Sequence, residues 1–237
     1  MSVSRVPRLG VVLLAAGRGA RMDLQPKCML ERNAKPLLFW QLRALLDDTL
    51  ATEGVANIVV VLGHYAEQIV PWIDELSVTT VRQTDVNHSM DDSINLGVRA
   101  LSDTDDQGVC RLKASLDAVM ICPTDLPLLR AEDYRAVIAA FWQRPSEAHF
   151  LCPLVNKVPG HPVMFDRTVA DVILTEGSGL SPRQWRTQNL AQVCEWVTDN
   201  AHYVWDVDSV EDIRRLAAST GIELKSMSDG CTEPTNS

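Results

Sequence analysis

The stretch GVVLLAAGRGARM at residues 10–22, followed closely by Pro-Lys at 26–27, decides how this chain folds. Its apolar first half predicts a buried first strand. The small residues that follow let backbone N–H groups approach phosphate oxygens. Arg18, Arg21 and Lys27 add positive charge in a chain that is acidic overall. The segment therefore predicts a strand that leads into a polyphosphate-binding loop.

Two familiar phosphate loops do not fit this segment. The P-loop needs a glycine, four residues and then Gly-Lys-Ser/Thr, and no such run occurs. The dinucleotide-binding pattern needs a third glycine, but the spacing that begins Gly17-x-Gly19 ends at Met22. A glycine-rich turn without a ligand is the plain alternative, and the length of the pattern weighs against it. A third kind of nucleotide loop is left.

Composition limits the classes of function. The chain has 237 residues, 46% of them hydrophobic, and a net charge of −9. This length allows one large domain or two small ones. The acidic balance disfavours a nucleic-acid surface, whereas a free nucleotide needs only a local cationic patch. No apolar run is long enough for a membrane span, and no signal peptide is recognised. The six cysteines form no C-x-x-C pair, so we expect a cytoplasmic protein with reduced thiols that binds neither nucleic acid nor membrane.

Strand and helix patterns alternate through the first half of the chain. The expected strands are residues 10–15, 57–62, 78–81 and 118–122. The expected helices are residues 36–50, 65–76, 89–101 and 132–143. This order predicts an α/β fold, a Rossmann-like and mostly parallel sheet with helices on both faces.

The second half is less regular. Its expected strands are residues 149–153, 161–165, 193–197 and 202–207, and its expected helices are 167–174, 183–190 and 209–218. Residues 219–237 are mostly small and polar, so we expect a flexible tail there. Residues 1–218 would then form a single domain.

Acidic residues follow two of the predicted strands. Asp125 stands between prolines just after residues 118–122, where a carboxylate suits Mg²⁺ and where ligands bind in parallel sheets. It lies too early in the chain to cap the next helix. Asp208 is either a second metal ligand or, with Ser209 and Asp212, part of the N-terminal cap of the last helix. Both interpretations of Asp208 stay open.

Residues 13–27 resemble the signature of the nucleoside-triphosphate transferase superfamily, written roughly L-A-A-G-x-G/S-x-R-M and then P-K. This superfamily includes the molybdenum cofactor cytidylyl- and guanylyltransferases and the sugar-phosphate nucleotidyltransferases. Further segments are similar to those of the molybdenum cofactor cytidylyltransferases, namely the acid of C-P-T-D-L-P at 122–127, Ser93 with Gly97, G-H-P-V-M-F at 160–165 and D-V-D-S-V-E-D at 206–212.

The resemblance implies a fold of the nucleotide-diphospho-sugar transferase type and a Mg²⁺-dependent enzyme. Such an enzyme would transfer CMP from CTP to the phosphate of molybdopterin, release pyrophosphate and deliver its product to a molybdoenzyme. The implied catalytic residues are Arg21, Lys27 and Asp125, and the implied metal ligands are Asp125 and Asp208. The implied binding residues are Leu14, Ala15, Ala16, Gly17, Arg18, Gly19 and Ser93 for the nucleotide, and Gly160, His161 and Pro162 for the acceptor substrate.

The chain also departs from that pattern. Asp23 replaces a common glycine, and the spacing from Met22 to Lys27 is closer to that of the sugar-phosphate and methylerythritol-phosphate enzymes. Asp91 and Asp92 stand where the molybdenum enzymes carry small residues. Two other hypotheses are therefore kept: a nucleotidyltransferase that uses another phosphorylated acceptor, and a non-catalytic chaperone that binds the cofactor.

Overall fold

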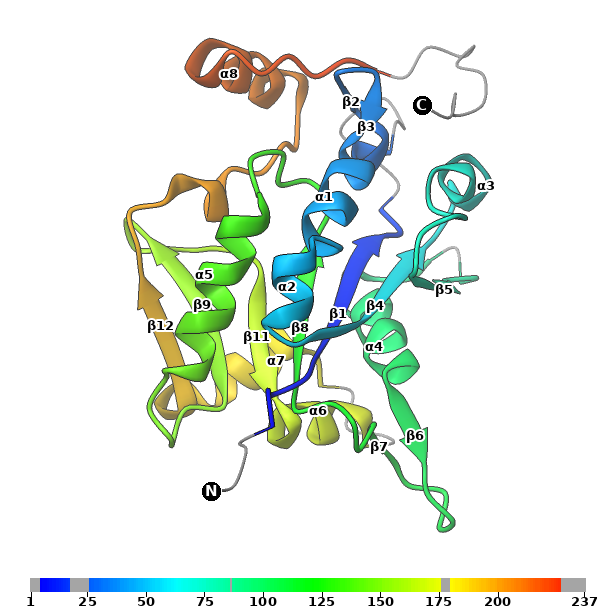
Figure 1. The fold of residues 1–237 in the computed structure, drawn as a ribbon, viewed down its shortest axis with the longest axis vertical. Helices are drawn as coiled ribbons and strands as arrows, with labels where there is room; N and C mark the ends of the chain where they lie inside the picture. Colours follow the sequence, from blue (N-terminus) through cyan, green and yellow to red (C-terminus); the bar gives the residue numbers. More distant parts are fainter. Residues whose placement is uncertain (1–4, 18–25, 86, 176–179, 227–237) are drawn as a thin grey trace.

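The computed structural model describes residues 5–17, 26–85, 87–175 and 180–226. Within them an eight-stranded sheet has the order β10-β9-β11-β8-β1-β4-β5, with β12 paired to β9 (Figure 1). Its strands are β1 (Leu9–Ala15), β4 (Val55–Leu62), β5 (Thr79–Arg82), β8 (Ala118–Pro123), β9 (Phe150–Val155), β10 (Val158–Pro159), β11 (Val163–Asp166) and β12 (Val193–Val197). Two small hairpins are formed by β2 (Glu31–Arg32) with β3 (Lys35–Pro36), and by β6 (Ser102–Thr104) with β7 (Cys110–Leu112).

The centre of the sheet is parallel. Strand β1 pairs in parallel with β4 on one side and with β8 on the other, and β4 pairs in parallel with β5. Strand β11 runs antiparallel between β8 and β9, and β12 returns parallel to β9. The mostly parallel α/β fold predicted from the alternation of elements is thus confirmed.

Helices cover both faces of the sheet (Figure 1). They are α1 (Leu37–Leu45), α2 (Asp48–Thr52), α3 (Ala66–Ile69), α4 (Met90–Ala100), α5 (Ala131–Trp142), α6 (Arg167–Leu174), α7 (Pro182–Gln188) and α8 (Val210–Thr220). Alternate residues of β1 face opposite sides of the sheet. Val11 and Leu13 pack in a buried cluster with α1, α2, α3 and α5. Val12 packs on the other face, in a cluster with α4, α6 and α7. Burial on both faces explains why the central strands are continuously apolar.

Helix α4 lies directly on the sheet. A Cβ atom added to Gly97 would stand 2.3 Å from Cγ1 of Val12, so no larger residue fits without displacement. The helix begins with a capping box, in which the Ser89 hydroxyl accepts from the N–H of Asp92 at 3.1 Å and Asp92 accepts from the N–H of Ser89 at 2.8 Å. The unusual acid at position 92 therefore has a structural explanation.

Three predicted elements differ in the structure. The helix expected at residues 36–50 is divided, because Asp47 caps a new helix by accepting from the N–H of Thr49 at 3.0 Å. The helix expected at residues 65–76 shortens to α3 and the 3₁₀ turn η2 (Val70–Trp72), which contains a proline. The strand expected at residues 202–207 is wrong, since the chain forms the 3₁₀ turn η4 (Ala201–Val204) and then irregular structure.

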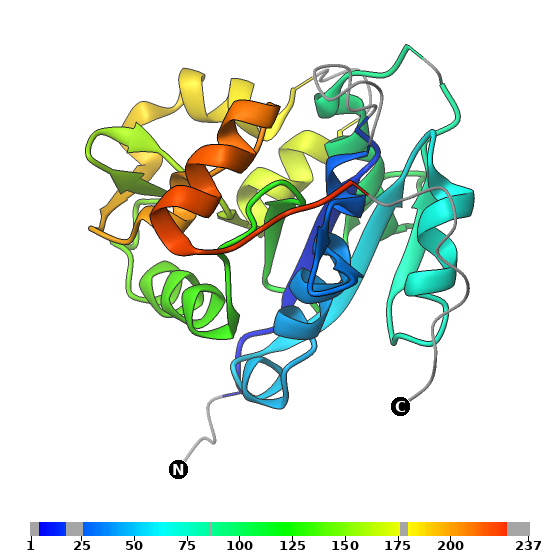
Figure 2. The ribbon, with the colours of Figure 1, turned by 90° about the horizontal axis from the view of Figure 1, so that it is seen from above.

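Helix α8 and the residues after it cover the carboxyl-end side of the sheet. Figure 2, seen from above, shows α8 and the segment after it, in orange and red, in front of the sheet. Leu216 and Leu224 join a small buried cluster with Leu30, and the backbones of Glu31 and Lys225 exchange hydrogen bonds of 2.8 and 3.0 Å. The tail boundary predicted at residue 219 is therefore placed too early. The rest of the predicted tail, 227–237, lies outside the described residues.

Two general features complete the fold. In the ranges that the structure describes, none of the helices has both the length and the apolar character needed to cross a bilayer. The cysteines within those ranges are free thiols, and all except Cys194 are buried.

Candidate functional site

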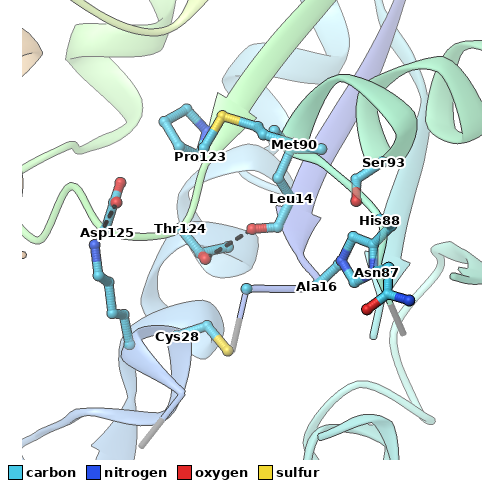
Figure 3. Close-up of a pocket in the computed structure, with 12 residues that line it drawn as sticks. Leu14, Ala16, Cys28, Asn87, His88, Met90, Ser93, Pro123, Thr124 and Asp125 are labelled. Atoms are coloured by element: carbon cyan, nitrogen blue, oxygen red, sulfur yellow. Dashed lines mark hydrogen bonds and ion pairs between the residues drawn. The ribbon is translucent and has the colours of Figure 1, made fainter. Parts of the chain in front are cut away.

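A pocket of about 440 Å³ lies at the carboxyl ends of β1 and β8, beside the start of α4 (Figure 3). Ligands bind at this end of parallel α/β sheets, and the volume is that of a small-molecule site. The residues that line it are Leu14, Ala16, Gly17, Lys27, Cys28, Asn87, His88, Met90, Ser93, Pro123, Thr124 and Asp125.

The backbone at the end of β1 is held from two sides. The hydroxyl of Thr124, which follows β8, donates a hydrogen bond of 2.8 Å to the carbonyl oxygen of Leu14 (Figure 3). After β4, Gly63 packs so closely that an added Cβ would lie 2.6 Å from the carbonyl oxygen of Ala16. These contacts fix the backbone at residues 14–16, just before the loop that the sequence predicts to bind phosphate.

Three charged side chains from distant parts of the chain meet beside this pocket. Lys27 lies in the 3₁₀ turn η1 (Lys27–Met29), Asp125 follows β8, and Asp208 precedes α8. The ammonium of Lys27 is 3.3 Å from Oδ2 of Asp125 and also forms an ion pair with Oδ1 of Asp208. A backbone hydrogen bond of 3.0 Å, from the N–H of Val207 to the carbonyl oxygen of Asp125, holds the two acidic segments together.

The electrostatics of this group keep Lys27 charged. Burial lowers the pKa of the Lys27 ammonium, but the hydrogen bonds and charges of Asp208 and Asp125 outweigh burial and raise it above 10.5. Burial raises the pKa of Asp125, and Lys27 offsets only a part of that effect. Asp206 adds a third acid, whose pKa burial and the two neighbouring carboxylates raise. Among the residues that the structure describes, several carboxylates of this site thus surround the ammonium of Lys27.

Two carboxylates of this group could serve as ligands of a divalent metal ion. Across the part of the chain that the structure describes, no group of three or more His, Cys, Asp or Glu could hold a metal ion. Mg²⁺ commonly takes only one or two carboxylates from the protein and completes its shell with phosphate oxygens and water. Asp125 and Asp208, which converge on one cation, can provide those two carboxylates.

The structure answers the question of the last helix cap. The N-cap of α8 is Ser209, whose hydroxyl accepts from the N–H of Asp212 at 3.3 Å, while Asp212 accepts from the N–H of Ser209 at 2.9 Å. The side chain of Asp208 is directed to Lys27 instead. Asp208 is therefore part of the charged group beside the pocket.

The opposite wall of the pocket comes from α4 and the loop before it. Ser93 is buried in the first turn of α4, and its hydroxyl lies 3.4 Å from the carbonyl oxygen of Ser89. Asn87, His88 and Met90 join Ser93 on this wall (Figure 3). Sequence reasoning missed these three residues, although their place just before Ser93, in a segment that begins a capped helix, was a usable signal.

The other predicted nucleotide-binding residues are distributed as follows. Leu14, Ala16 and Gly17 line the pocket with Ser93, whereas Ala15 faces the hydrophobic core. The predicted residues Arg18, Gly19 and Arg21 lie outside the described residues.

The predicted acceptor segment does not line this pocket. The N–H of His161 donates to the carbonyl oxygen of Tyr203 at 2.8 Å, and a Cβ on Gly160 would stand 2.5 Å from the same oxygen. Pro162 follows His161 through a cis peptide bond. Although His161 is open to solvent, crowding by protein atoms and the charge of Arg186 lower the pKa of its imidazole to about 4.

The buried carboxylate of Asp133, which was not among the predicted site residues, holds residues 200–203 beside the predicted acceptor segment. Asp133, in the first turn of α5, accepts hydrogen bonds from Nδ2 of Asn200 at 2.6 Å and lies 2.9 Å from Nδ1 of His202. Its backbone carbonyl accepts from the hydroxyl of Tyr203 at 2.9 Å. Asp133 thus holds η4 in place. The backbone of η4 accepts the hydrogen bond from His161, and Asp208 follows η4 in the chain.

The geometry defines an α/β domain with an acid- and lysine-lined pocket at the carboxyl ends of its strands. The sequence pattern of the MobA-like NTP transferase domain matches residues 11–193. The chain belongs to this family.

The chain is also similar to several other known proteins. The chain is 27% identical over 154 residues to the bifunctional protein GlmU of Solibacter usitatus (strain Ellin6076). The aligned residues make up 65% of this chain but only 30% of the length of GlmU. The crystal structure of Rv0371c from Mycobacterium tuberculosis H37Rv superposes with a TM-score of 0.66 at 21% identity, covering 91% of this chain and all of that one. A second structure of Rv0371c is a complex with manganese, with a TM-score of 0.62, 20% identity and coverage of 90% and 100%.

Molybdopterin-guanine dinucleotide biosynthesis protein A from Archaeoglobus fulgidus is also similar, with a TM-score of 0.56, 14% identity and coverage of 87% of this chain and 95% of that one. At these levels of identity the solved structures show a shared fold.

Proposed function

We propose that this protein is a nucleotidyltransferase that transfers CMP from CTP to the phosphate of molybdopterin and releases pyrophosphate. The observation that carries the proposal is the convergence of Lys27, Asp125 and Asp208 at the pocket where β1 and β8 end. Nucleotidyl transfer needs charge neutralisation and positioning around a triphosphate, and this group can provide both.

In the proposed reaction, a phosphate oxygen of the acceptor attacks the α-phosphorus of the nucleotide. A new phosphorus–oxygen bond forms as the bond from the α-phosphorus to its bridging oxygen breaks, and pyrophosphate leaves with the bond electrons. The ammonium of Lys27 stabilises the negative charge that grows on the phosphate oxygens. Backbone N–H groups after β1 and the guanidinium of Arg21 are assigned to the triphosphate.

Asp125 and Asp208 are proposed to hold Mg²⁺, because both carboxylates contact Lys27 beside the pocket. The bound ion would neutralise phosphate charge and orient the triphosphate. The manganese complex of the structurally similar Rv0371c supports a divalent cation in this fold.

The base preference follows from the wall of the pocket. The methyl group of Ala16 and the buried Ser93 limit the room at this end of the pocket, and both residues line it. Cytosine is smaller than guanine, and polar backbone groups near Ala16 can meet its N4, N3 and O2 atoms. One such mismatch is worth about 1–3 kcal/mol, so we expect CTP to be preferred over GTP by roughly ten- to a few hundredfold.

Molybdopterin as acceptor is supported by the family and by the G-H-P-V-M-F segment, in which Gly160, His161 and Pro162 are proposed to contact it. A sugar phosphate or methylerythritol phosphate is the alternative acceptor. A chaperone without turnover is a weaker candidate, because binding alone needs no lysine held between two carboxylates. A cytoplasmic location and delivery to a molybdoenzyme belong to the same proposal.

The test is a pyrophosphate-release assay with each of the four NTPs, with and without Mg²⁺. The acceptors are molybdopterin, methylerythritol phosphate and a panel of sugar phosphates, and the Asp125→Asn variant is the control for contaminating activity. We expect turnover with CTP, Mg²⁺ and molybdopterin. A preference for GTP, or turnover only with another acceptor, would contradict the substrate assignment, and no turnover with any pair would contradict the enzyme.

A further inference from the structure

Two carboxylates in this site share a single described ammonium group. Lys27 Nζ lies 3.3 Å from Oδ2 of Asp125 and is ion-paired with Oδ1 of Asp208. The three side chains are only partly accessible, at 22% for Lys27, 22% for Asp125 and 36% for Asp208. Lys27 and Asp125 also form part of the pocket wall. The ammonium therefore lies between the acids that the proposed function assigns to a metal ion.

The arrangement has a clear electrostatic cause. Carboxylates held close together in a partly buried place repel each other, and a cation between them removes that cost. The turn η1 places the Lys27 stem so that one ammonium can reach both acids. The protein thus carries its own counterion for this pair.

An ammonium and a divalent cation compete for such a place. Both seek the same carboxylate oxygens, and they repel each other strongly at a separation of a few ångströms. A divalent ion can coordinate Asp125 and Asp208 only after Lys27 has moved away. In the absence of nucleotide, Lys27 therefore weakens metal binding.

The pocket offers Lys27 another partner when a nucleotide is present. Its side chain is a flexible four-carbon stem with a compact charge, and it already lines the pocket. A triphosphate in the pocket presents oxygens that can accept from the ammonium. If Lys27 moved from the carboxylates to the phosphate, Asp125 and Asp208 could bind the metal. Nucleotide and metal would then each strengthen the binding of the other.

We propose that Lys27 is an exchangeable counterion, which occupies the place of the divalent cation between Asp125 and Asp208 until the nucleotide draws it away. This inference rests on the proposed function for the identity of the nucleotide. The competition between Lys27 and metal involves Lys27, Asp125 and Asp208, and it needs no nucleotide.

The experiment measures binding of Mn²⁺ alone to the full-length protein, without nucleotide or acceptor, by the loss of the free Mn²⁺ signal in electron paramagnetic resonance. The variant Lys27→Met removes the charge and keeps an unbranched stem. We expect it to bind Mn²⁺ at least tenfold more tightly than the unmodified protein. Lys27→Arg, which keeps a cation, should bind as weakly as the unmodified protein.

Two further variants locate the effect. Lys35→Met removes an exposed cation that lies over the ring of Phe39, outside the pocket wall, and should leave Mn²⁺ affinity unchanged. Lys27→Met combined with Asp125→Asn should lose the gain, because one of the two carboxylates is gone. Circular dichroism and thermal unfolding establish that each variant is folded, and Lys27→Gln replaces Lys27→Met if that variant does not fold.

Equal or weaker Mn²⁺ binding by a folded Lys27→Met or Lys27→Gln protein would overturn the counterion proposal. The same holds if the gain persists when Asp125 is replaced. Since the assay contains no nucleotide and no acceptor, its outcome is independent of the transfer activity. A gain in Mn²⁺ affinity together with no pyrophosphate release from any NTP would contradict the enzyme and leave the competition between Lys27 and the metal intact.

Discussion

The N–H of Val207 donates a hydrogen bond of 3.0 Å to the carbonyl oxygen of Asp125. This one bond connects the turn after β8 to the segment just before α8, so it sets the spacing of the two carboxylates that meet at Lys27. Two parts of the chain that are far apart in sequence thereby form one wall of the site.

The first prediction concerns the carboxylate after β8. We expect Asp125→Asn to abolish Mg²⁺-dependent pyrophosphate release and to weaken Mg²⁺–nucleotide binding, because a neutral amide is a poorer ligand for a hard cation. Turnover and calorimetric titration with Mg²⁺–CTP measure both effects. Unchanged dependence on Mg²⁺ would place the metal elsewhere.

The second prediction concerns the lysine itself. Lys27→Ala removes the charge that faces the proposed triphosphate, and we expect turnover to fall by about a thousandfold. The protein should still fold, since Lys27 lies in a short turn at the pocket rim rather than in the hydrophobic core. Single-turnover kinetics provide the measurement, with Lys35→Ala as the matched control. A folded Lys27→Ala protein with normal turnover would remove this residue from the mechanism.

The third prediction concerns the segment after α8. Leu224 is only 6% exposed and packs with Leu30 and Leu216. We expect Leu224→Ala to lower the free energy of unfolding by about 2 kcal/mol. Leu190→Ala, at a residue that is 68% exposed, should change it by less than about 0.5 kcal/mol. Urea denaturation gives both values, and equal effects would mean that the packing of Leu224 contributes no stability.

The fourth prediction concerns pH. Hydrogen bonds from Ser209 lower the pKa of Asp212 below 3.8, with Arg215 adding to the effect. A carboxyl group whose pKa is lower in the folded state stabilises the protein above its unfolded value, and this stability is lost as the pH falls through the folded value. We expect Asp212→Ala to cost about 1 kcal/mol at pH 7 and clearly less at pH 2.5.

Urea unfolding of both proteins at the two pH values tests this directly. Asp212→Asn, which keeps an acceptor without a charge, should be intermediate at pH 7. A cost that does not change between pH 7 and pH 2.5 would show that the charge of Asp212 is unimportant to the cap.

The sequence predicted the centre of the fold well. Apolar runs such as residues 118–122 are buried on both faces, so they carry a strong signal and lie close to their observed bounds. Capping residues such as Ser89 also stand in local patterns that can be recognised without a structure. Asp125 could be placed at the end of a strand for the same reason, since it follows residues 118–122, whereas Ser93 is indicated by the resemblance to cytidylyltransferases; both line the pocket.

The parts that could not be predicted depend on contacts between distant segments. The alternation in residues 202–207 resembles a strand, but the hydrogen bonds of Asp133 to Asn200 and His202 favour the turn η4. Ile222 and Leu224 look like two apolar residues in a polar tail until the cluster around Leu30 is known. The pairing of Asp208 with Lys27 likewise exists only in the folded chain.

The backbone bridge between Glu31 and Lys225 has a consequence for how the protein is made. Synthesis proceeds from the N-terminus, so the sheet and most of the pocket wall leave the ribosome before Asp208, α8 and Lys225 do. The nascent chain therefore carries Lys27 and Asp125 without Asp208 while residues 126–207 are being made. The second carboxylate reaches them only after the segment just before α8 has emerged, so the charged group beside the pocket is completed later than the central sheet.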